Sequence, residues 1–205
     1  MAYEKKEKIL ALVLLGLFLG AVGLHYALAP WGFYSALPPQ ERQLRLSLVE
    51  TAEGWLGANE ADGSHQAIID RYNTLDPLPV DYLLGYGDSW CAAFVTVAAM
   101  ERGLTDIIPP ECGCERQIEL FQALGRWEER DDAIPEPGDL IYYDWNVTEQ
   151  TDSTGWSDHV GIVVGVKWPF VKVIEGNKDD DVSYRVILIG DKTIRGYGRP
   201  DYAGR

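Results

Sequence analysis

The order of the sequence patterns along the chain constrains its fold most strongly. Apolar residues recur at helical spacing in the first half, whereas short apolar or alternating runs occupy the second half. Helices that precede strands are typical of an α+β domain, so we predict N-terminal helices packed on a largely antiparallel β-sheet. The expected helices are 41–56, 65–72, 90–102 and 116–124, and the expected strands are 139–143, 159–166, 171–175, 182–189 and 193–197.

Length and charge limit the domain organisation and the partners. The chain has 205 residues and a formal net charge of −14. This length predicts one domain of roughly 150–170 residues with an attachment segment. The acidic excess argues against nucleic acid and against an anionic membrane surface as partners of the folded part. We expect a cytoplasmic tail and anchor at 1–29, a linker at 30–43 and the folded domain at 44–205.

The N-terminal segment 9–28 is apolar apart from His25. About 20 apolar residues can span a bilayer as a helix, so we predict one transmembrane helix before the domain. Three lysines precede the segment and the next cationic residue is Arg42, which places the N-terminus in the cytoplasm and the domain outside the cell membrane. A cleaved signal peptide is the alternative, because 27–29 resembles a cleavage site, although Pro30 would hinder cleavage.

Cys91 lies where a thiolate is favoured. The sequence from 86 to 103 is typical of a turn, a cap and a helix, with Asp88 or Ser89 as the capping residue and Gly103 at the C-terminal end. Cys91 then falls in the first helical turn, where free N–H groups and the helix dipole stabilise negative charge. Such a thiolate acts as a nucleophile only with a base and an orienting group nearby.

The candidate base is His159. The chain has three histidines, and His25 lies in the apolar N-terminal segment. His65 lies in a polar stretch before a short helix, whereas His159 begins a strand directly after a long loop. A base at the edge of a strand beside a loop is held rigidly and stays open to substrate. We therefore favour His159 over His65.

Glu175 and Asn177 are the candidate orienting groups, since alternate residues of a strand share one face. If 167–169 forms a three-residue loop, Asn177 lies opposite His159 and Glu175 lies opposite Gly161, which leaves room beside the ring. A two-residue loop would turn the strand over, because a slip by one residue exchanges the faces. The residues alone do not decide which of the two touches the ring.

Cys112 and Cys114 leave three interpretations open. A disulfide between residues this close in sequence would be strained, and no second Cys or His pair completes a metal site. We favour two loop thiols or one structural thiol packed near the helix. Each interpretation leaves Cys91 unpaired, which suits a reactive thiol. We predict no metal and no cofactor, and interpret the acidic run 179–181 as a solvated turn.

Several blocks of the sequence together resemble the CHAP domain, a family within the NlpC/P60-like, papain-fold group of cysteine peptidases and amidases. The resemblance covers roughly 44–202 and implies a papain-like fold. A calcium-binding loop, found in some members, is not evident, and neither is a separate wall-binding module, which the membrane anchor would replace. The blocks are WCAAFV at 90–95, PGDLIYYDW at 137–145, DHVGIV at 158–163, IEGN at 174–177 and IRGYGRPDY at 194–202.

The resemblance also implies roles. Cys91 would be the nucleophile, His159 the general base, and Glu175 and Asn177 the residues that orient the imidazole. Family members cleave amide bonds of peptidoglycan, either between muramic acid and alanine or within the peptides. The expected function is thus a membrane-anchored extracytoplasmic cysteine hydrolase with peptidoglycan as its partner.

Four aromatic side chains could line a groove for glycan or peptide, with core packing as the alternative; the candidates are Tyr86, Trp90, Trp145 and Trp156. Two other functions stay open. One is a non-catalytic, membrane-tethered binding module, which would require a degraded catalytic position. The other is a thiol amidase or acyltransferase that acts away from the cell wall.

Overall fold

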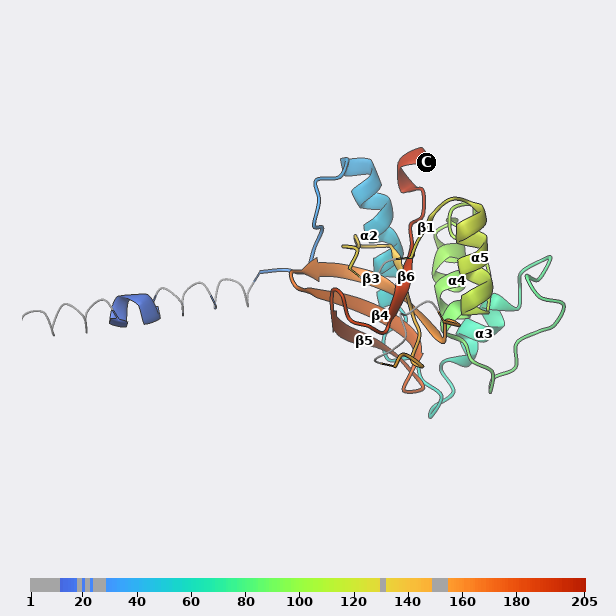
Figure 1. Cartoon of the computed structure of the whole chain (residues 1–205). Coiled ribbons are helices and arrows are strands. Elements are labelled where there is room, and N and C mark those ends of the chain that lie inside the picture. Colours follow the sequence, from blue (N-terminus) through green and yellow to red (C-terminus); the bar gives the residue numbers. More distant parts are fainter. Residues whose placement is uncertain (1–11, 18–19, 21–22, 24–28, 130–131, 149–154) are drawn as a thin grey trace, which may run out of the picture. The chain divides into compact units, whose positions relative to one another are not determined.

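The computed structural model describes residues 12–17, 20, 23, 29–129, 132–148 and 155–205. The chain divides into two compact units, Met1–Pro30 and Trp31–Arg205. The second unit contains the helices and strands described below (Figure 1).

The predicted transmembrane helix at 9–28 is not found, and this part of the fold prediction is wrong. Within the described ranges, no helix is both long enough and apolar enough to cross a membrane. Much of the predicted segment, including 9–11 and 24–28, lies outside the described residues.

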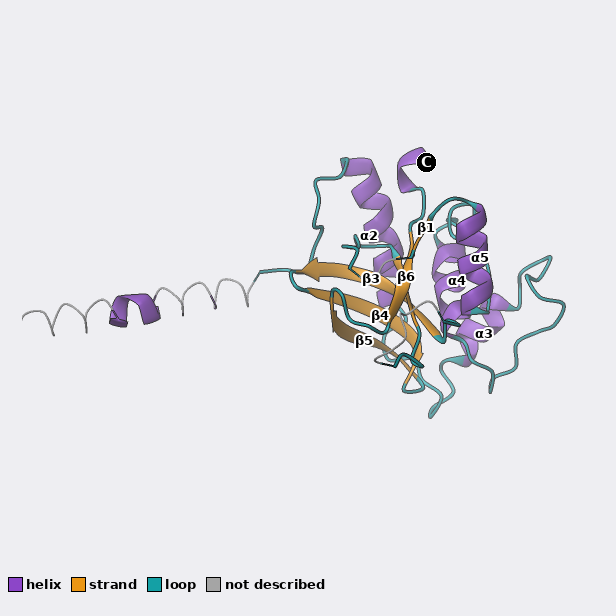
Figure 2. Cartoon of the chain, viewed as in Figure 1, coloured by secondary structure: helices purple, strands orange, loops and turns teal. Residues whose placement is uncertain are grey.

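Helices come first and strands follow, as the sequence patterns predict (Figure 2). The α+β class with an antiparallel sheet is therefore confirmed. The helices are α2 (Pro39–Glu53), α3 (Gln66–Tyr72), α4 (Cys91–Glu101) and α5 (Cys114–Ala123), with the 3-10 helix η1 (Tyr202–Gly204) near the C-terminus. The strands are β1 (Trp127–Glu128), β2 (Leu140–Tyr143), β3 (His159–Lys167), β4 (Phe170–Lys178), β5 (Asp181–Leu188) and β6 (Ile194–Gly198).

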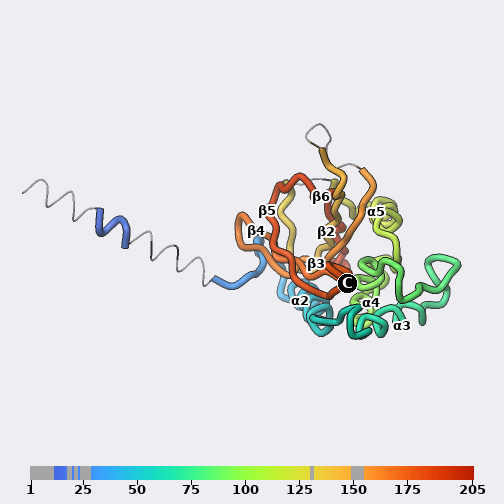
Figure 3. The backbone as a smooth tube through the Cα atoms, turned by 90° about the horizontal axis from the view of Figure 1, so that it is seen from below, coloured from blue at the N-terminus to red at the C-terminus, as the bar shows by residue number. Residues whose placement is uncertain are grey.

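The six strands form one sheet in the order β1-β6-β2-β3-β4-β5, and every described pairing is antiparallel. Helices α2, α3 and α4 lie along one side of this sheet (Figure 3). Helix α4 packs against β3 and β4, and α2 packs against β3. The sheet thus presents its central strands to the helix that begins at Cys91.

Helix α4 is the centre of the core. Residues 91–99 are all buried, which is typical of a helix enclosed by protein rather than of an amphipathic surface helix. Strand β2 alternates between two apolar clusters: Leu140 and Tyr142 face the cluster that contains α4, whereas Ile141 and Tyr143 face a second cluster. Because both faces of β2 are buried, its sequence is continuously apolar rather than alternating.

The β3–β4 hairpin has the predicted offset near the site, but its turn is shorter than predicted and a bulge makes up the difference. Its turn has two residues, Trp168 and Pro169, because Lys167 pairs with Phe170. The predicted three-residue loop is therefore wrong. The register then shifts between Val163 and Gly165, so that Ile162 pairs with Ile174. This bulge restores near the site the offset that a three-residue loop would have given.

Close backbone packing joins β4 to α4 at Gly176. A Cβ atom at this position would lie 2.5 Å from Cβ of Phe94 and 2.8 Å from Cζ3 of Trp90. These separations are too short for any side chain, so β4 can contact the first turn of α4 only with glycine at residue 176.

A buried carboxylate, Asp139, ties three parts of the domain together. It accepts a hydrogen bond from Arg45 of α2 at 2.8 Å and another from Arg199, which follows β6. Oδ2 of Asp139 also accepts a hydrogen bond from the backbone N–H of the nearby Glu136 at 2.8 Å. Two arginines therefore neutralise and anchor one carboxylate that is shielded from solvent.

The stretch that we assigned to a linker, 30–43, contacts the folded unit. Gly32 pairs with Val166 of β3, and the backbone N–H groups of Tyr34 and Ser35 donate to the carboxylate of Glu136 at 2.9 and 2.8 Å. Helix α2 begins within this stretch, at Pro39.

Candidate active site

Cys91 is the first residue of α4, as predicted, but the helix begins without a side-chain cap. Trp90 is the N-cap residue, and its carbonyl accepts the N–H of Phe94 at 2.8 Å. The predicted capping role of Asp88 is wrong, since its carboxylate accepts the N–H of Gly85 instead. Uncapped N–H groups therefore remain beside the Cys91 sulfur, where they favour negative charge.

The ring of His159 contacts the carboxylate of Glu175. The distance from Nε2 of His159 to Oε2 of Glu175 is 3.2 Å, and Glu175 is fully buried. A Cβ atom at Gly161 would lie 2.5 Å from Cγ1 of Val173 and 2.6 Å from Cγ of Glu175, so the glycine makes room for the Glu175 side chain rather than, as predicted, for the ring. With Nε2 directed at Glu175, Nδ1 is the nitrogen left for the hydrogen bond with Cys91.

Arg185 of β5 completes a chain of charges that the sequence did not reveal. Its Nε donates to both oxygens of Glu175, at 2.7 and 3.0 Å. The guanidinium also lies over the rings of Tyr143 and Trp145, with 5.4 and 5.0 Å to their centroids. Glu175 is thereby fixed between a cation on one side and the imidazole on the other.

The pKa values shift in the direction that an ion pair requires. Burial alone would lower the pKa of His159, but hydrogen bonds to Cys91 and Glu175 raise it to about 9. The pKa of Cys91 lies well below its usual value, because a hydrogen bond from Cys114 and the interaction with His159 outweigh the effect of burial. Burial would raise the pKa of Glu175, but His159 and Arg185 lower it. The arrangement favours thiolate and imidazolium together.

Asn177 lies at an irregular point of β4. Its backbone is left-handed, with φ of 56°, and the register between β4 and β5 shifts between Glu175 and Lys178. Its side chain is half-buried. Of the two candidate orienting groups, Glu175 is the one whose contact with the ring is seen.

The aromatic candidates for substrate binding separate into two groups. Trp90 is fully buried and donates its Nε1–H to Glu60 at 3.0 Å, so the prediction that it lines a groove is wrong. Trp145 is exposed and stacks on Tyr143, with 4.8 Å between ring centroids, and lies 6.0 Å from the His159 ring. Trp156 is 72% exposed. These two tryptophans remain candidates for contact with a substrate.

Tyr86 and His65 form a separate group near Trp90. Tyr86 is 47% exposed, and its hydroxyl donates to Asp70 at 2.8 Å. His65 is buried, with Nδ1 3.2 Å from the carbonyl of Asn59 and Nε2 3.0 Å from that of Tyr86. Both ring nitrogens of His65 are thus engaged by backbone, which agrees with its rejection as the base.

The three cysteines are free, so the strained disulfide between Cys112 and Cys114 is not formed. Cys114 is the first residue of α5, and its sulfur lies 3.5 Å from that of Cys91. Cys112 is half-buried, and burial raises its pKa. Of the favoured interpretations, one thiol packed near the helix agrees with Cys114, but its direct contact with Cys91 was not predicted.

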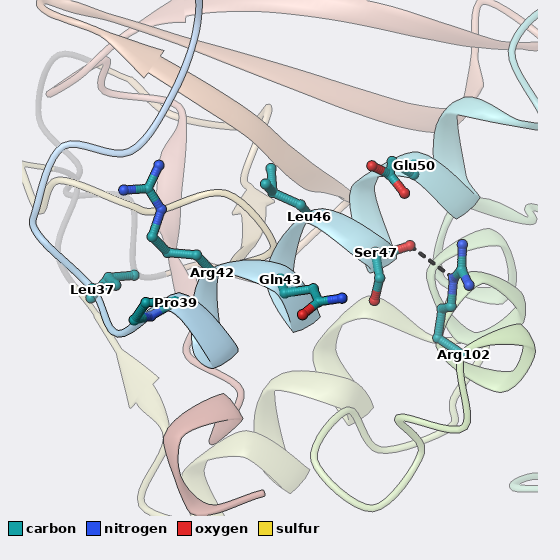
Figure 4. Close-up of a pocket in the computed structure, with 8 residues that line it drawn as sticks. All are labelled: Leu37, Pro39, Arg42, Gln43, Leu46, Ser47, Glu50 and Arg102. Atoms are coloured by element: carbon teal, nitrogen blue, oxygen red, sulfur yellow. Dashed lines mark hydrogen bonds between the residues drawn. The ribbon is translucent and has the colours of Figure 1, made fainter.

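Two cavities lie elsewhere on the domain. One, of about 570 Å³, runs along α2, where the backbone carbonyl of Ser47 accepts a hydrogen bond from Arg102 (Figure 4). Another, of about 460 Å³, lies between the proline-rich loop at 77–79 and α5. Neither is lined by Cys91, His159 or Glu175.

The ion pair predicts how Cys91 responds to pH. Replacing Glu175 with glutamine removes a negative charge that raises the pKa of His159. The pKa of His159 therefore falls, and the imidazolium loses its proton at a lower pH. The thiolate then loses cationic support and the pKa of Cys91 rises. The midpoint of the pH profile for iodoacetamide labelling of Cys91 should therefore move upward by about one pH unit or more. Peptide mass spectrometry measures labelling at Cys91 alone.

The matched control is Glu50→Gln, an exposed glutamate of α2 away from these groups. This variant should label like the unaltered protein. An unchanged or lower midpoint in Glu175→Gln would contradict the proposed electrostatic role of the carboxylate.

Comparison with known protein families matches the part of the chain that contains these site residues. The family model described as CHAP domain matches residues 82–177, a range that includes Cys91, His159, Glu175 and Asn177. No curated protein matches the chain. The solved structure titled "The crystal structure of Ly7917" is 12% identical with a TM-score of 0.45, and the match covers 77% of this chain and 62% of that one.

Proposed function

We propose a cysteine-dependent peptidoglycan hydrolase, on the premise that residues 82–177 match the CHAP-domain family model, which indicates a hydrolase of the amidase or peptidase type. Cys91 is the proposed nucleophile, His159 the general acid and base, and Glu175 the residue that orients the imidazole. The observation that supports this most is the contact between the His159 ring and the buried Glu175 carboxylate, together with the interaction with His159 that helps to lower the pKa of Cys91.

In the proposed first step, the Cys91 thiolate attacks the carbonyl carbon of an amide. The negative charge that develops on the carbonyl oxygen lies near the N–H of Cys91, which has no acceptor within the helix because it belongs to the first turn. Protonated His159 then gives its proton to the leaving amine, and the C–N bond breaks. The products are a free amine and a thioester on Cys91.

In the second step, neutral His159 takes a proton from water, which attacks the thioester and releases the acid. The thiolate and the imidazolium are restored together. Glu175 stabilises the imidazolium throughout, and Arg185 keeps that carboxylate in place. Asn177 stays a proposed second orienting group.

Two exposed tryptophans, of which Trp145 lies beside His159, fit a polymeric substrate. Trp145 stacks over Tyr143 beside the imidazole, and Trp156 exposes most of its ring. Aromatic faces bind the apolar faces of sugars and peptide side chains through large contact areas. We propose that these two residues contact peptidoglycan, and that the domain acts outside the cytoplasm, where this polymer lies.

Digestion of purified sacculi tests the function. The full chain should release soluble fragments and expose new amino groups, which a colorimetric amine assay and mass spectrometry of the fragments measure. Free alanine amino groups on peptides separated from glycan would identify an amidase. New amino groups within linked peptides would identify an endopeptidase.

Two other outcomes would overturn the proposal. Sacculi that stay intact while bound protein sediments with them would indicate a binding module. Intact sacculi together with hydrolysis of a small amide, or transfer of its acyl group to an added amine, would indicate an amidase or acyltransferase that acts away from the wall.

A further inference from the structure

The sulfur of Cys114 lies 3.5 Å from that of Cys91, although the proposed hydrolysis uses only one thiol. Each cysteine is the first residue of its helix, and the two helices contact one another through this pair. Both cysteines are buried, with exposed fractions of 6% for Cys91 and 8% for Cys114. The proposed hydrolysis gives no role to the second of these two contacting thiols.

The two sulfurs differ in protonation. The pKa of Cys114 lies well above its usual value, because its hydrogen bond to Cys91 and its burial both oppose ionisation. The pKa of Cys91 is lowered by the same hydrogen bond. The pair therefore consists of a thiolate that accepts and a thiol that donates. In redox-sensitive sites, a thiolate reacts first with an oxidant and a neighbouring thiol then resolves the product.

We propose that Cys91 and Cys114 form a reversible oxidative modification site, in which a hydroperoxide converts the pair to a Cys91–Cys114 disulfide. Its consequence for hydrolysis rests on the proposed function, because the disulfide occupies the nucleophilic sulfur. Reduction by a dithiol restores both thiols.

The chemistry balances with hydrogen peroxide as the oxidant. The Cys91 thiolate attacks one peroxide oxygen, the O–O bond breaks, and Cys91 becomes a sulfenic acid while hydroxide leaves. The sulfur of Cys114 then attacks the sulfur of Cys91, and the S–O bond breaks. The departing hydroxide takes the proton of Cys114 and leaves as water. The hydroxide released in the first step takes the proton held by the His159 imidazolium. Overall one thiolate, one thiol, one imidazolium and one peroxide give one disulfide, one neutral imidazole and two waters.

The geometry favours Cys114 over Cys112 as the resolving thiol. A disulfide requires about 2.05 Å between the sulfurs, so the pair must approach by about 1.5 Å, a shift that rotation of two short side chains can supply. Cys112 precedes α5, and its backbone N–H donates to the carboxylate of Glu111 at 2.8 Å, whereas the described hydrogen bond to the Cys91 sulfur comes from Cys114. A rapid disulfide also protects Cys91 from irreversible oxidation to the sulfinic acid.

The experiment treats the full chain with hydrogen peroxide and then measures two properties. Non-reducing peptide mass spectrometry should find the peptides of Cys91 and Cys114 joined, with the loss of two hydrogen atoms. Sacculus hydrolysis should fall by about tenfold or more and return after dithiothreitol. The control Cys112→Ser should behave like the unaltered protein.

Cys114→Ser should lose the joined peptides and accumulate sulfinic acid at Cys91, so that dithiothreitol no longer restores hydrolysis. Circular dichroism establishes that the variant is folded, and Cys114→Ala serves as a second variant. The inference is overturned if the unaltered protein forms no Cys91–Cys114 peptide while Cys91 is oxidised. Joined peptides in a protein that never digests sacculi would contradict the proposed hydrolase and leave the disulfide intact.

Discussion

Replacing Cys91 with alanine should abolish the release of fragments from sacculi, with a fall in kcat/KM of about 10⁴-fold or more. The neighbouring thiol of Cys114 is a poor substitute, because burial opposes its ionisation even without the hydrogen bond to Cys91. Cys91→Ser should fail nearly as completely. Its hydroxyl is almost the size of the thiol but does not ionise beside an imidazole with a pKa of about 9. The measurement is the initial rate of amine release.

The kcat/KM of His159→Ala should fall almost as far as that of Cys91→Ala. The double variant should be no slower than Cys91→Ala, because residues that act as a unit lose their effect together. Cys112→Ala is the matched control, since this cysteine is not part of the proposed machinery, and it should keep the normal rate. A Cys91→Ala protein that still releases fragments would rule out covalent catalysis by this thiol.

Replacing Asp139 with asparagine should lower the free energy of unfolding by about 3–5 kcal/mol. The substitution keeps the shape of the side chain but leaves Arg45 and Arg199 without their shared carboxylate. Both arginines are largely shielded, so water cannot replace the lost charge. Urea denaturation followed by tryptophan fluorescence measures the change, which should appear as a lower midpoint with a similar slope.

The matched control is Asp201→Asn, which removes the carboxylate of a much more exposed pair with Arg126. That change should cost less than about 1 kcal/mol. Equal losses in the two variants would mean that burial does not determine the importance of Asp139.

The sequence was sufficient for the helices and the central strands because their apolar patterns are local. Helix α4 and strand β3 begin at Cys91 and His159, which are the residues singled out. The offset of the hairpin near the site was also correct, but for the wrong reason. The shorter turn at Trp168 and Pro169 and the bulge between Val163 and Gly165 compensate for one another, and neither has a local signal.

The residues that were missed are brought to the site by long-range packing. Arg185 reaches Glu175 across the β4–β5 pairing, and Tyr143 reaches His159 across the β2–β3 pairing. Cys114 reaches Cys91 only because two helix starts meet. A prediction of the strand order would have placed Arg185 in the strand next to Glu175. A buried glutamate needs a cationic partner, and Arg185 would then have been the candidate.

Trp90 was misassigned because its sequence neighbours do not reveal its direction. It precedes a helix that is apolar on every side, so no periodicity indicates whether the indole faces the core or the solvent. The transmembrane prediction rested on the hydropathy of 9–28, and no helix within the described residues is long and apolar enough to cross a membrane.

The bare backbone at Gly176 has a consequence for how the proposed enzyme can vary. Residue 175 holds the imidazole's partner and the facing helix begins at Cys91, so this point of contact acts as a spacer between base and nucleophile. A methyl group there would act as a wedge and move Glu175, with the hairpin, away from the sulfur. The distance between the base and the nucleophile thus depends on the absence of a Cβ atom at residue 176.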